Sequence, residues 1–224
     1  MLNGWLILSL ILMLADWAAV WRGWSWVNYF TKPGVMLALM AWFVSTAGSG
    51  GNAPWFLAGL AASLLGDILL LLPRCFFVYG LVAFLAALLA YAIGLNIPLL
   101  PPTPLMMILA VLTVAAWVAL VALVLPHVKN SPDHCKMAGP VGVYAAAMCL
   151  MAFSALHTLG RPDWPLSAAV LAANGGLLFF FSDALLAFDR FIRPLPYARL
   201  FVRIPYHLGQ LGLIAGALLA LTSG

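Results

Sequence analysis

Eight apolar stretches, separated by short breaks rich in proline and glycine, run through this sequence. A helix that crosses a bilayer needs about 20 apolar residues and sometimes only 17. Each stretch meets that length, alone or with its flanks. The sequence therefore predicts an all-α, polytopic membrane protein. The expected bundle has eight transmembrane helices, at residues 3–21, 33–48, 54–72, 76–95, 103–125, 140–158, 165–188 and 202–222.

The composition leaves little room for anything outside the membrane. The chain has 224 residues, of which 66% are hydrophobic and 7% are charged, whereas soluble domains carry about 25% charged residues. No soluble domain fits between the apolar stretches, so residues 1–224 are predicted to form a single integral membrane domain. The first stretch lacks a basic leader and a cleavage site, and it is therefore interpreted as a true helix.

The basic residues predict how the chain is oriented. Nine of them lie in the connections after the first, third, fifth and seventh stretches, and only Arg161 lies in the others. Under the positive-inside rule, the basic connections face the cytoplasm. Both termini are then expected outside, in a bacterial inner membrane. The net charge of +4 reflects this orientation, and no nucleic-acid partner is expected.

Three aspartates lie inside apolar stretches: Asp16, Asp67 and Asp183. A charged side chain in a membrane helix costs a few kcal/mol or more, so each is a functional-site candidate. With the expected orientation, all three lie roughly 7–10 Å below the cytoplasmic surface, at about 1.5 Å of rise per residue. Their common depth predicts one acidic cavity that opens towards the inner leaflet.

Other polar residues are expected at the same level. Lys32 is placed at the start of the second helix beside Pro33, where it could hold a phosphate or simply extend to the membrane surface. Tyr206 and Gln210 are four positions apart and share one helix face. The candidate substrate-binding residues are Lys32, Tyr144, Tyr206, Gln210, Ser63 and Ser182.

An internal repeat is also possible. Asp67 and Asp183 are separated by about half of the chain, and Lys32-Pro-Gly-Val35 is loosely echoed by Gly139-Pro-Val-Gly142. Four helices in each half would make two parallel repeats, related by an axis along the membrane normal.

The residues suggest acid–base chemistry. Two neighbouring carboxyl groups can keep one group protonated as an acid and the other ionised as a base. Lys32 and the arginines near the cavity would suit an anionic head group such as phosphate. A cavity that is acidic inside, basic at its rim and open to one leaflet suits an amphiphile with one hydrocarbon chain.

The sequence resembles the YhhN-like membrane protein family, which includes the lysoplasmalogenases. The motifs that carry the resemblance follow in order over nearly the whole chain: Lys32-Pro33, Leu65-Gly-Asp67, Phe76 to Gly80 with Phe84, Pro140 with Tyr144, Gly176 to Asp183, and Tyr206 with Gln210. One position departs from the family pattern, because Leu88 stands where the family often has a histidine. If that histidine takes part in the reaction of other family members, this chain works without it, and its substrate could differ from theirs.

The resemblance implies hydrolysis of the vinyl ether bond of a lysoplasmalogen, giving a fatty aldehyde and glycerophosphoethanolamine or glycerophosphocholine. Asp67 and Asp183 are the expected acid–base pair, with neither role assigned, and Asp16 would tune them or position water. Lys32 would hold the phosphate. Tyr144, Tyr206 and Gln210 would orient the carboxyl groups or the glycerol hydroxyl. This reaction needs no metal and no cofactor. The partners are a single-chain ether phospholipid and membrane lipids, and the oligomeric state is left open.

Two other functions remain open at this point. Buried aspartates also serve as proton or cation sites in transporters, although no polar trail leads to the outer side. A non-catalytic lipid-binding protein is the second alternative. Outside the candidate site, Asp189, Arg190 and Arg193 are interpreted as a solvated loop, and the histidines of the basic connections as surface groups. These are His127, His134 and His207.

Overall fold

The computed structural model describes residues 3–47, 50–131 and 135–223, and the helices dominate that part of the chain. Eight of them are long and apolar enough to cross a membrane. They are α1 (Gly4–Arg22), α2 (Ser25–Ala47), α3 (Ala53–Leu71), α4 (Phe77–Asn96), α5 (Pro104–Asn130), α6 (Ala138–His157), α7 (Leu166–Phe191) and α8 (Ala198–Thr222). The described residues form no strand. The prediction of an all-α, eight-helix membrane protein is confirmed.

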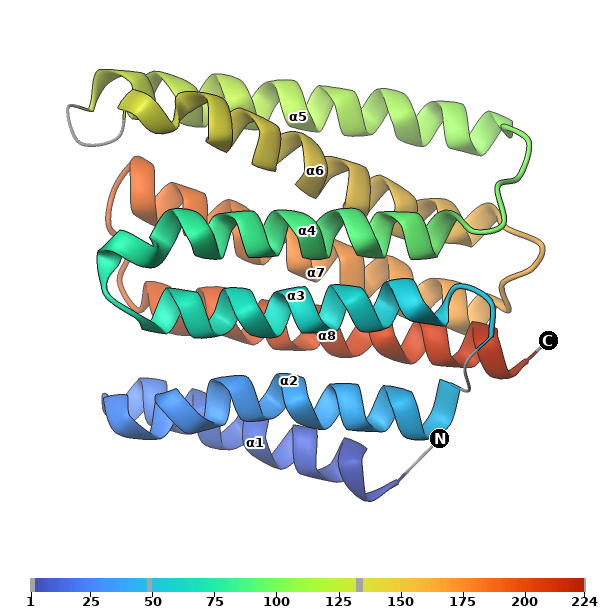
Figure 1. Ribbon diagram of the computed structural model, residues 1–224. Coiled ribbons are helices and arrows are strands. Elements are labelled where there is room, and N and C mark those ends of the chain that lie inside the picture. The colour runs from blue at the N-terminus through green and yellow to red at the C-terminus, as the bar shows by residue number, and fades with distance from the viewer. Residues whose placement is uncertain (1–2, 48–49, 132–134, 224) are drawn as a thin grey trace.

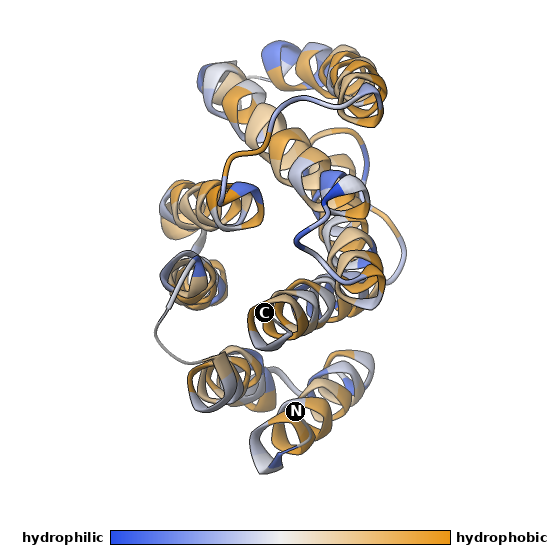
Figure 2. Cartoon of the chain, turned by 90° about the vertical axis from the view of Figure 1, so that its right-hand side faces the viewer, coloured by the Kyte–Doolittle hydropathy of each residue, from blue (hydrophilic) through white to orange (hydrophobic). Residues whose placement is uncertain are grey.

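The helices run side by side as one bundle, and both termini lie at the same end (Figure 1). The connections α1–α2, α3–α4, α5–α6 and α7–α8 lie at the opposite end, which we call the basic end. In the end-on view, α2, α3 and α4 form one side, while α1, α8 and α7 form the other (Figure 2). Helix α8 contacts α1, α2, α3 and α7, so it is the central helix of this half of the bundle.

The predicted start of the second helix was wrong. Residue 33 was expected to open it because proline suits a first turn, but α2 begins at Ser25 and continues through Pro33. Transmembrane helices tolerate an internal proline, because neighbouring groups satisfy the freed carbonyl. Gly23 makes the tight turn before α2 in a left-handed conformation, with φ of 72°. Lys32 consequently lies two turns inside the helix.

Two further boundaries also differ from the prediction. Helix α5 continues past Pro126 to Asn130, and α8 begins at Ala198 with Pro205 inside it. Because α8 begins at residue 198 and not at the predicted residue 202, Arg203 lies deeper inside the helix than expected. Pro33 and Pro126 therefore made two predicted helices too short, whereas the predicted last helix already contained Pro205.

Small residues allow α7 and α8 to approach each other closely. A Cβ atom added to Gly175 would lie 2.4 Å from the backbone nitrogen of Leu213, and one added to Gly209 would lie 2.8 Å from that of Phe179. Between α3 and α4, glycines accept aromatic rings. The Tyr91 ring lies over Gly59, and the Phe84 ring lies over Gly66. Small residues are a common means of close helix packing in membranes.

Helix α5 lies at the edge of the bundle, packed mainly against α6 and α7. Only Val124 and Val128 are fully buried on it, while Val111 is 69% exposed. Hydrocarbon lipid is as apolar as these side chains, so such a surface suits the membrane. The principal core lies elsewhere, among α2, α3, α4, α6, α7 and α8.

Candidate active site

A cavity of about 370 Å³ opens at the basic end between α2, α3, α7 and α8. Its wall includes five of the residues that the sequence had selected: Lys32, Asp67, Ser182, Asp183 and Tyr206. The predicted cavity therefore exists at the basic end, and it contains two of the three membrane aspartates. Phe84 and Leu186 contribute apolar side chains to the cavity wall.

Asp67 lies on α3 and is completely buried. Its Oδ1 atom forms an ion pair with the Lys32 ammonium at 2.8 Å. The Tyr206 hydroxyl donates a hydrogen bond to Oδ2, also at 2.8 Å. A buried carboxylate is stable only when it is paired and hydrogen-bonded. These two partners are therefore those required by an ionised Asp67.

A buried hydrogen-bond network lies behind Tyr206. Gln210 donates to Ser63 at 2.8 Å and accepts from the Tyr91 hydroxyl at 2.6 Å. All four side chains, including Tyr206, are buried. Gln210 and Ser63 do not line the cavity. They fix α8 against α3 and α4, and thereby fix the position of the Tyr206 hydroxyl.

Asp183 lies on α7 and has different surroundings. The Tyr144 hydroxyl of α6 donates to its Oδ2 atom at 2.6 Å, and no cation pairs with it among the described residues. Asp183 is 8% exposed. It lines both the polar cavity and a second, apolar pocket. The two carboxyl groups of the cavity thus differ: Asp67 has a cation and a hydroxyl donor, and Asp183 has only a hydroxyl donor.

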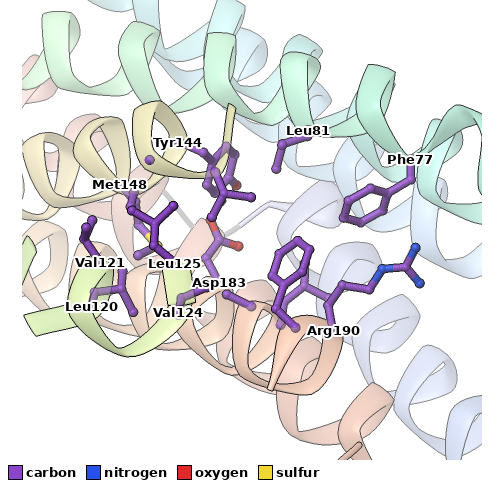
Figure 3. A pocket seen from close by; sticks show the side chains of 16 residues that line it. Phe77, Leu81, Leu120, Val121, Val124, Leu125, Tyr144, Met148, Asp183 and Arg190 are labelled. Carbon is purple, nitrogen blue, oxygen red and sulfur yellow. Dashed lines mark hydrogen bonds between the residues drawn. The ribbon is translucent and has the colours of Figure 1, made fainter. Parts of the chain in front are cut away.

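The apolar pocket beside Asp183 lies between α4, α5, α6 and α7. Figure 3 shows Asp183 and Tyr144 inside it, with Leu120, Val121 and Val124 of α5 close by. Phe77 and Arg190 lie at another part of its wall, where the guanidinium carbon is 4.8 Å from the ring centroid. Asp183 is consequently at the junction of a polar space and an apolar one.

Asp16 does not line the cavity. It is fully buried on α1, where Thr31 donates to its Oδ1 atom at 2.6 Å. The Arg203 guanidinium binds both of its oxygens, at 3.1 and 3.0 Å. Arg203 itself lines the cavity. Asp16 therefore holds an arginine at the cavity wall instead of facing the cavity itself.

The rim of the cavity is basic, as the sequence suggested. Arg199 and Arg203 line it together with Lys32, and Asp189 supplies one acidic group. Asp189 also accepts a hydrogen bond from the backbone of Leu195 at 2.8 Å. Because α7 continues to Phe191, Asp189 and Arg190 are helical residues that line pockets, and their interpretation as a solvated loop was wrong.

The remaining candidates have specific partners. The Ser182 hydroxyl donates to the backbone carbonyl of Val202 at 2.8 Å, which ties α7 to α8 at the cavity wall. Leu88, where the family often has a histidine, is completely buried in the core. The position of the family histidine is therefore an apolar part of the core in this protein.

Sequence reasoning missed three residues of the candidate site. Arg203, Thr31 and Tyr91 were not selected, because a single arginine near a helix end or an isolated hydroxyl carries no visible pattern. His207 was expected at the surface, and this was wrong: it is completely buried and accepts a hydrogen bond from the Trp17 indole at 3.0 Å. His127 is exposed as expected, while His134 lies outside the described residues.

The ion-pair and hydrogen-bond pattern bears on the predicted repeat. Lys32 on α2 binds Asp67 on α3, and Tyr144 on α6 binds Asp183 on α7. In each half, a side chain of the second helix thus contacts the carboxyl group of the third. Helix α4 also packs on α6, and α8 packs on α2, as a two-fold relation would require. The repeat remains a prediction that these contacts favour.

The helices and the cavity together define a multi-pass integral membrane protein with a buried pair of aspartates near one end. The YhhN family model matches residues 27–217, which include every residue that lines the cavity except Ser25. The chain therefore belongs to the YhhN family.

Several relatives have names that describe an activity or a family. Lysoplasmalogenase TMEM86B of Mus musculus is 36% identical over 197 residues, which cover 87% of this chain and 76% of that protein. Lysoplasmalogenase TMEM86B of Homo sapiens is 34% identical over 198 residues, with the same coverage. The uncharacterized membrane protein YhhN of Escherichia coli O157:H7 is 39% identical over 92 residues, covering 36% of this chain and 40% of that protein. No solved structure matches this chain.

Proposed function

We propose that this protein is a lysoplasmalogenase, which hydrolyses the vinyl ether bond of a single-chain alkenyl phospholipid. The names of its relatives support this activity, since they match most of the chain. The observation that carries the proposal is the unequal carboxyl pair in one cavity. Asp67 is paired with Lys32, while Asp183 lies beside an apolar pocket without a cation.

Asp183 fits the role of general acid. Vinyl ether hydrolysis begins when a proton is added to the carbon β to the ether oxygen. The electrons of the double bond form the new C–H bond, and the cation that results is shared between carbon and the ether oxygen. With Oδ2 accepting from Tyr144, the proton to be donated would reside on Oδ1. The adjacent apolar pocket would bring the hydrocarbon carbon to this acid.

Asp67 fits the role of general base. Its carboxylate would stabilise the cation and take a proton from the water that attacks the α carbon, giving a hemiacetal. The bond from that carbon to the glycerol oxygen then breaks. Asp67 returns its proton to the glycerol oxygen, and the hemiacetal hydroxyl gives its proton to Asp183. The products are a fatty aldehyde and glycerophosphoethanolamine or glycerophosphocholine, and both carboxyl groups regain their initial states.

The other polar residues would position these groups. Tyr144 and Tyr206 each fix one carboxyl group by a hydrogen bond, and Gln210 with Ser63 fixes Tyr206. Ser182 would hold the α7–α8 contact at the cavity wall.

The basic rim would bind the phosphate of the head group. Arg199 and Arg203 line the cavity with Lys32, and guanidinium groups bind phosphate with two parallel hydrogen bonds. Asp16 acts through Arg203, so we assign it a positioning role. Asp189 would face the positive charge of an ethanolamine or choline group.

We further propose that the basic end faces the cytoplasm in a bacterial inner membrane and that both termini are outside. Nine of the ten basic residues lie towards the basic end, and this bias supports the orientation. The cavity would then open to the cytoplasmic leaflet.

The proposal is tested by aldehyde release from 1-alkenyl lysophosphoethanolamine. Purified protein would be compared with the variants Asp67→Asn and Asp183→Asn. Asp163→Asn is the matched control, because Asp163 pairs with Arg161 away from the cavity. We expect aldehyde from the parent and from the control, and none from the other two under conditions where both remain folded. A folded parent that releases no aldehyde would refute the activity, and a proton-gradient transport assay would then test the alternative function.

A further inference from the structure

The apolar pocket beside Asp183 adjoins the polar cavity. Both Asp183 and Leu186 line the two spaces. Apart from Asp183, Tyr144 and Arg190, the side chains around the apolar pocket are aliphatic or aromatic, or the thioether of Met148. A molecule that extends from the cavity across Asp183 would therefore pass from polar surroundings into apolar ones.

The location of the pocket agrees with a hydrocarbon occupant. One wall is α5, the helix with the most lipid-exposed surface. A second apolar pocket follows the same seam deeper in the bundle, between α5, α6 and α7, with Leu112 and Phe180 in its wall. The seam thus continues from the level of Asp183 towards the middle of the membrane.

We propose that this pocket holds the first carbons of the substrate's alkenyl chain, and that Gly142 determines which chains fit. The proposal rests on the function proposed above and adds to it a site for the chain. The head group would lie in the polar cavity, and the vinyl ether at the junction, next to Asp183. The chain would continue along the seam beneath α5.

Gly142 is the residue through which the pocket can be closed without disturbing the fold. It lies on α6 and lines the pocket, and a Cβ atom placed on it would meet no other atom within 4 Å. Any side chain at this position would grow into the open space. Gly139 lies one turn earlier on α6, is equally open and does not line the pocket. It provides the matched control.

Binding can be tested separately from turnover. The probe is a 1-alkyl lysophosphoethanolamine, which lacks the double bond and is not hydrolysed, with a photoreactive diazirine on the first carbons of its chain. After illumination, we expect labelled peptides from α5 and α6 that line the pocket. Gly142→Leu should reduce this labelling by at least about tenfold, because the side chain and the lipid chain exclude each other. Gly139→Leu should leave it unchanged.

Two results would overturn the proposal. One is labelling on α2 and α3 instead, and the other is labelling of the pocket that Gly142→Leu does not reduce, which would indicate membrane lipid binding at the surface. Gly142→Ala is the milder second variant should the leucine prevent folding, and it should give an intermediate loss. Because the probe is not hydrolysed, the labelling does not depend on the proposed hydrolysis. If only the hydrolysis proposal is wrong, the pocket should still be labelled, whereas if the chain-site proposal is wrong, it should not.

Turnover gives an independent readout. For a long-chain alkenyl substrate, Gly142→Leu should lower kcat/KM by about tenfold or more. For a vinyl ether with a two-carbon alkenyl group, which does not reach past the junction, the change should be small. Equal losses for both substrates would mean that the leucine disturbs Asp183 or Tyr144, and would contradict a chain site at Gly142.

Discussion

The Lys32–Asp67 ion pair should stabilise the fold as a unit, and its two partners should be unequal. The Asp67 side chain has no exposed surface, and that of Lys32 is 10% exposed at the cavity wall. Removing one partner of a buried ion pair costs about 3–5 kcal/mol, because the other charge remains unpaired. Lys32→Met leaves the fully buried carboxylate without its partner, so the loss of stability should lie at the upper end of this range. Asp67→Leu leaves an ammonium that reaches the cavity, so it should cost less.

The double variant Lys32→Met/Asp67→Leu distinguishes this account from simple loss of packing. Replacing both members of a buried pair by apolar residues is often nearly neutral, so stability should return close to that of the parent while activity stays absent. For a chain of this size, about 2–4 °C accompanies each kcal/mol. At about 5 kcal/mol, Lys32→Met should therefore lower the midpoint of thermal unfolding by roughly 10–20 °C, measured by tryptophan fluorescence in detergent. A double variant as unstable as the sum of the single variants would refute the coupling.

Three further predictions concern positioning, packing and orientation. Asp16→Asn should raise KM for the lysophospholipid several-fold and change kcat little in steady-state assays, because Arg203 loses its orientation; an unchanged KM with lower kcat would contradict this. Gly175→Ala should destabilise the bundle by about 1–3 kcal/mol through a clash with α8 main chain, whereas Gly139→Ala should not; equal unfolding midpoints would show that the helices can separate. Cys75, exposed at the basic end, should resist a membrane-impermeant maleimide in intact cells and react after lysis, as followed by mass spectrometry of its peptide. Labelling in intact cells would reverse the orientation.

The number of helices could be predicted because hydrophobic length is a direct physical requirement of the bilayer. The common level of Asp67 and Asp183, which line one cavity, followed from the same reasoning, since residue number converts directly to height in a helix. The start of α2 could not be predicted in this way. A proline such as Pro33 is compatible with a helix start and with a helix interior, and packing decides between them.

The sequence did not predict which helices lie side by side or which of their faces are in contact. In a membrane helix the outward face is as apolar as the buried one, so periodicity does not show which face meets which neighbour. Asp16 and Asp67 therefore looked alike, although one faces Arg203 at the bundle's edge and the other lies in the cavity wall. Tyr91 was likewise overlooked, because only the fold brings its hydroxyl to Gln210.

The central claim is that Asp183 adds a proton to a carbon of the vinyl ether. The most direct measurement is hydrolysis in D₂O, with the aldehyde trapped at once by an alkoxyamine and analysed by mass spectrometry. The account predicts one deuterium on the carbon next to the aldehyde group, a slower rate in D₂O, and loss of product in Asp183→Asn. Aldehyde without deuterium, or turnover that persists in Asp183→Asn, would contradict it.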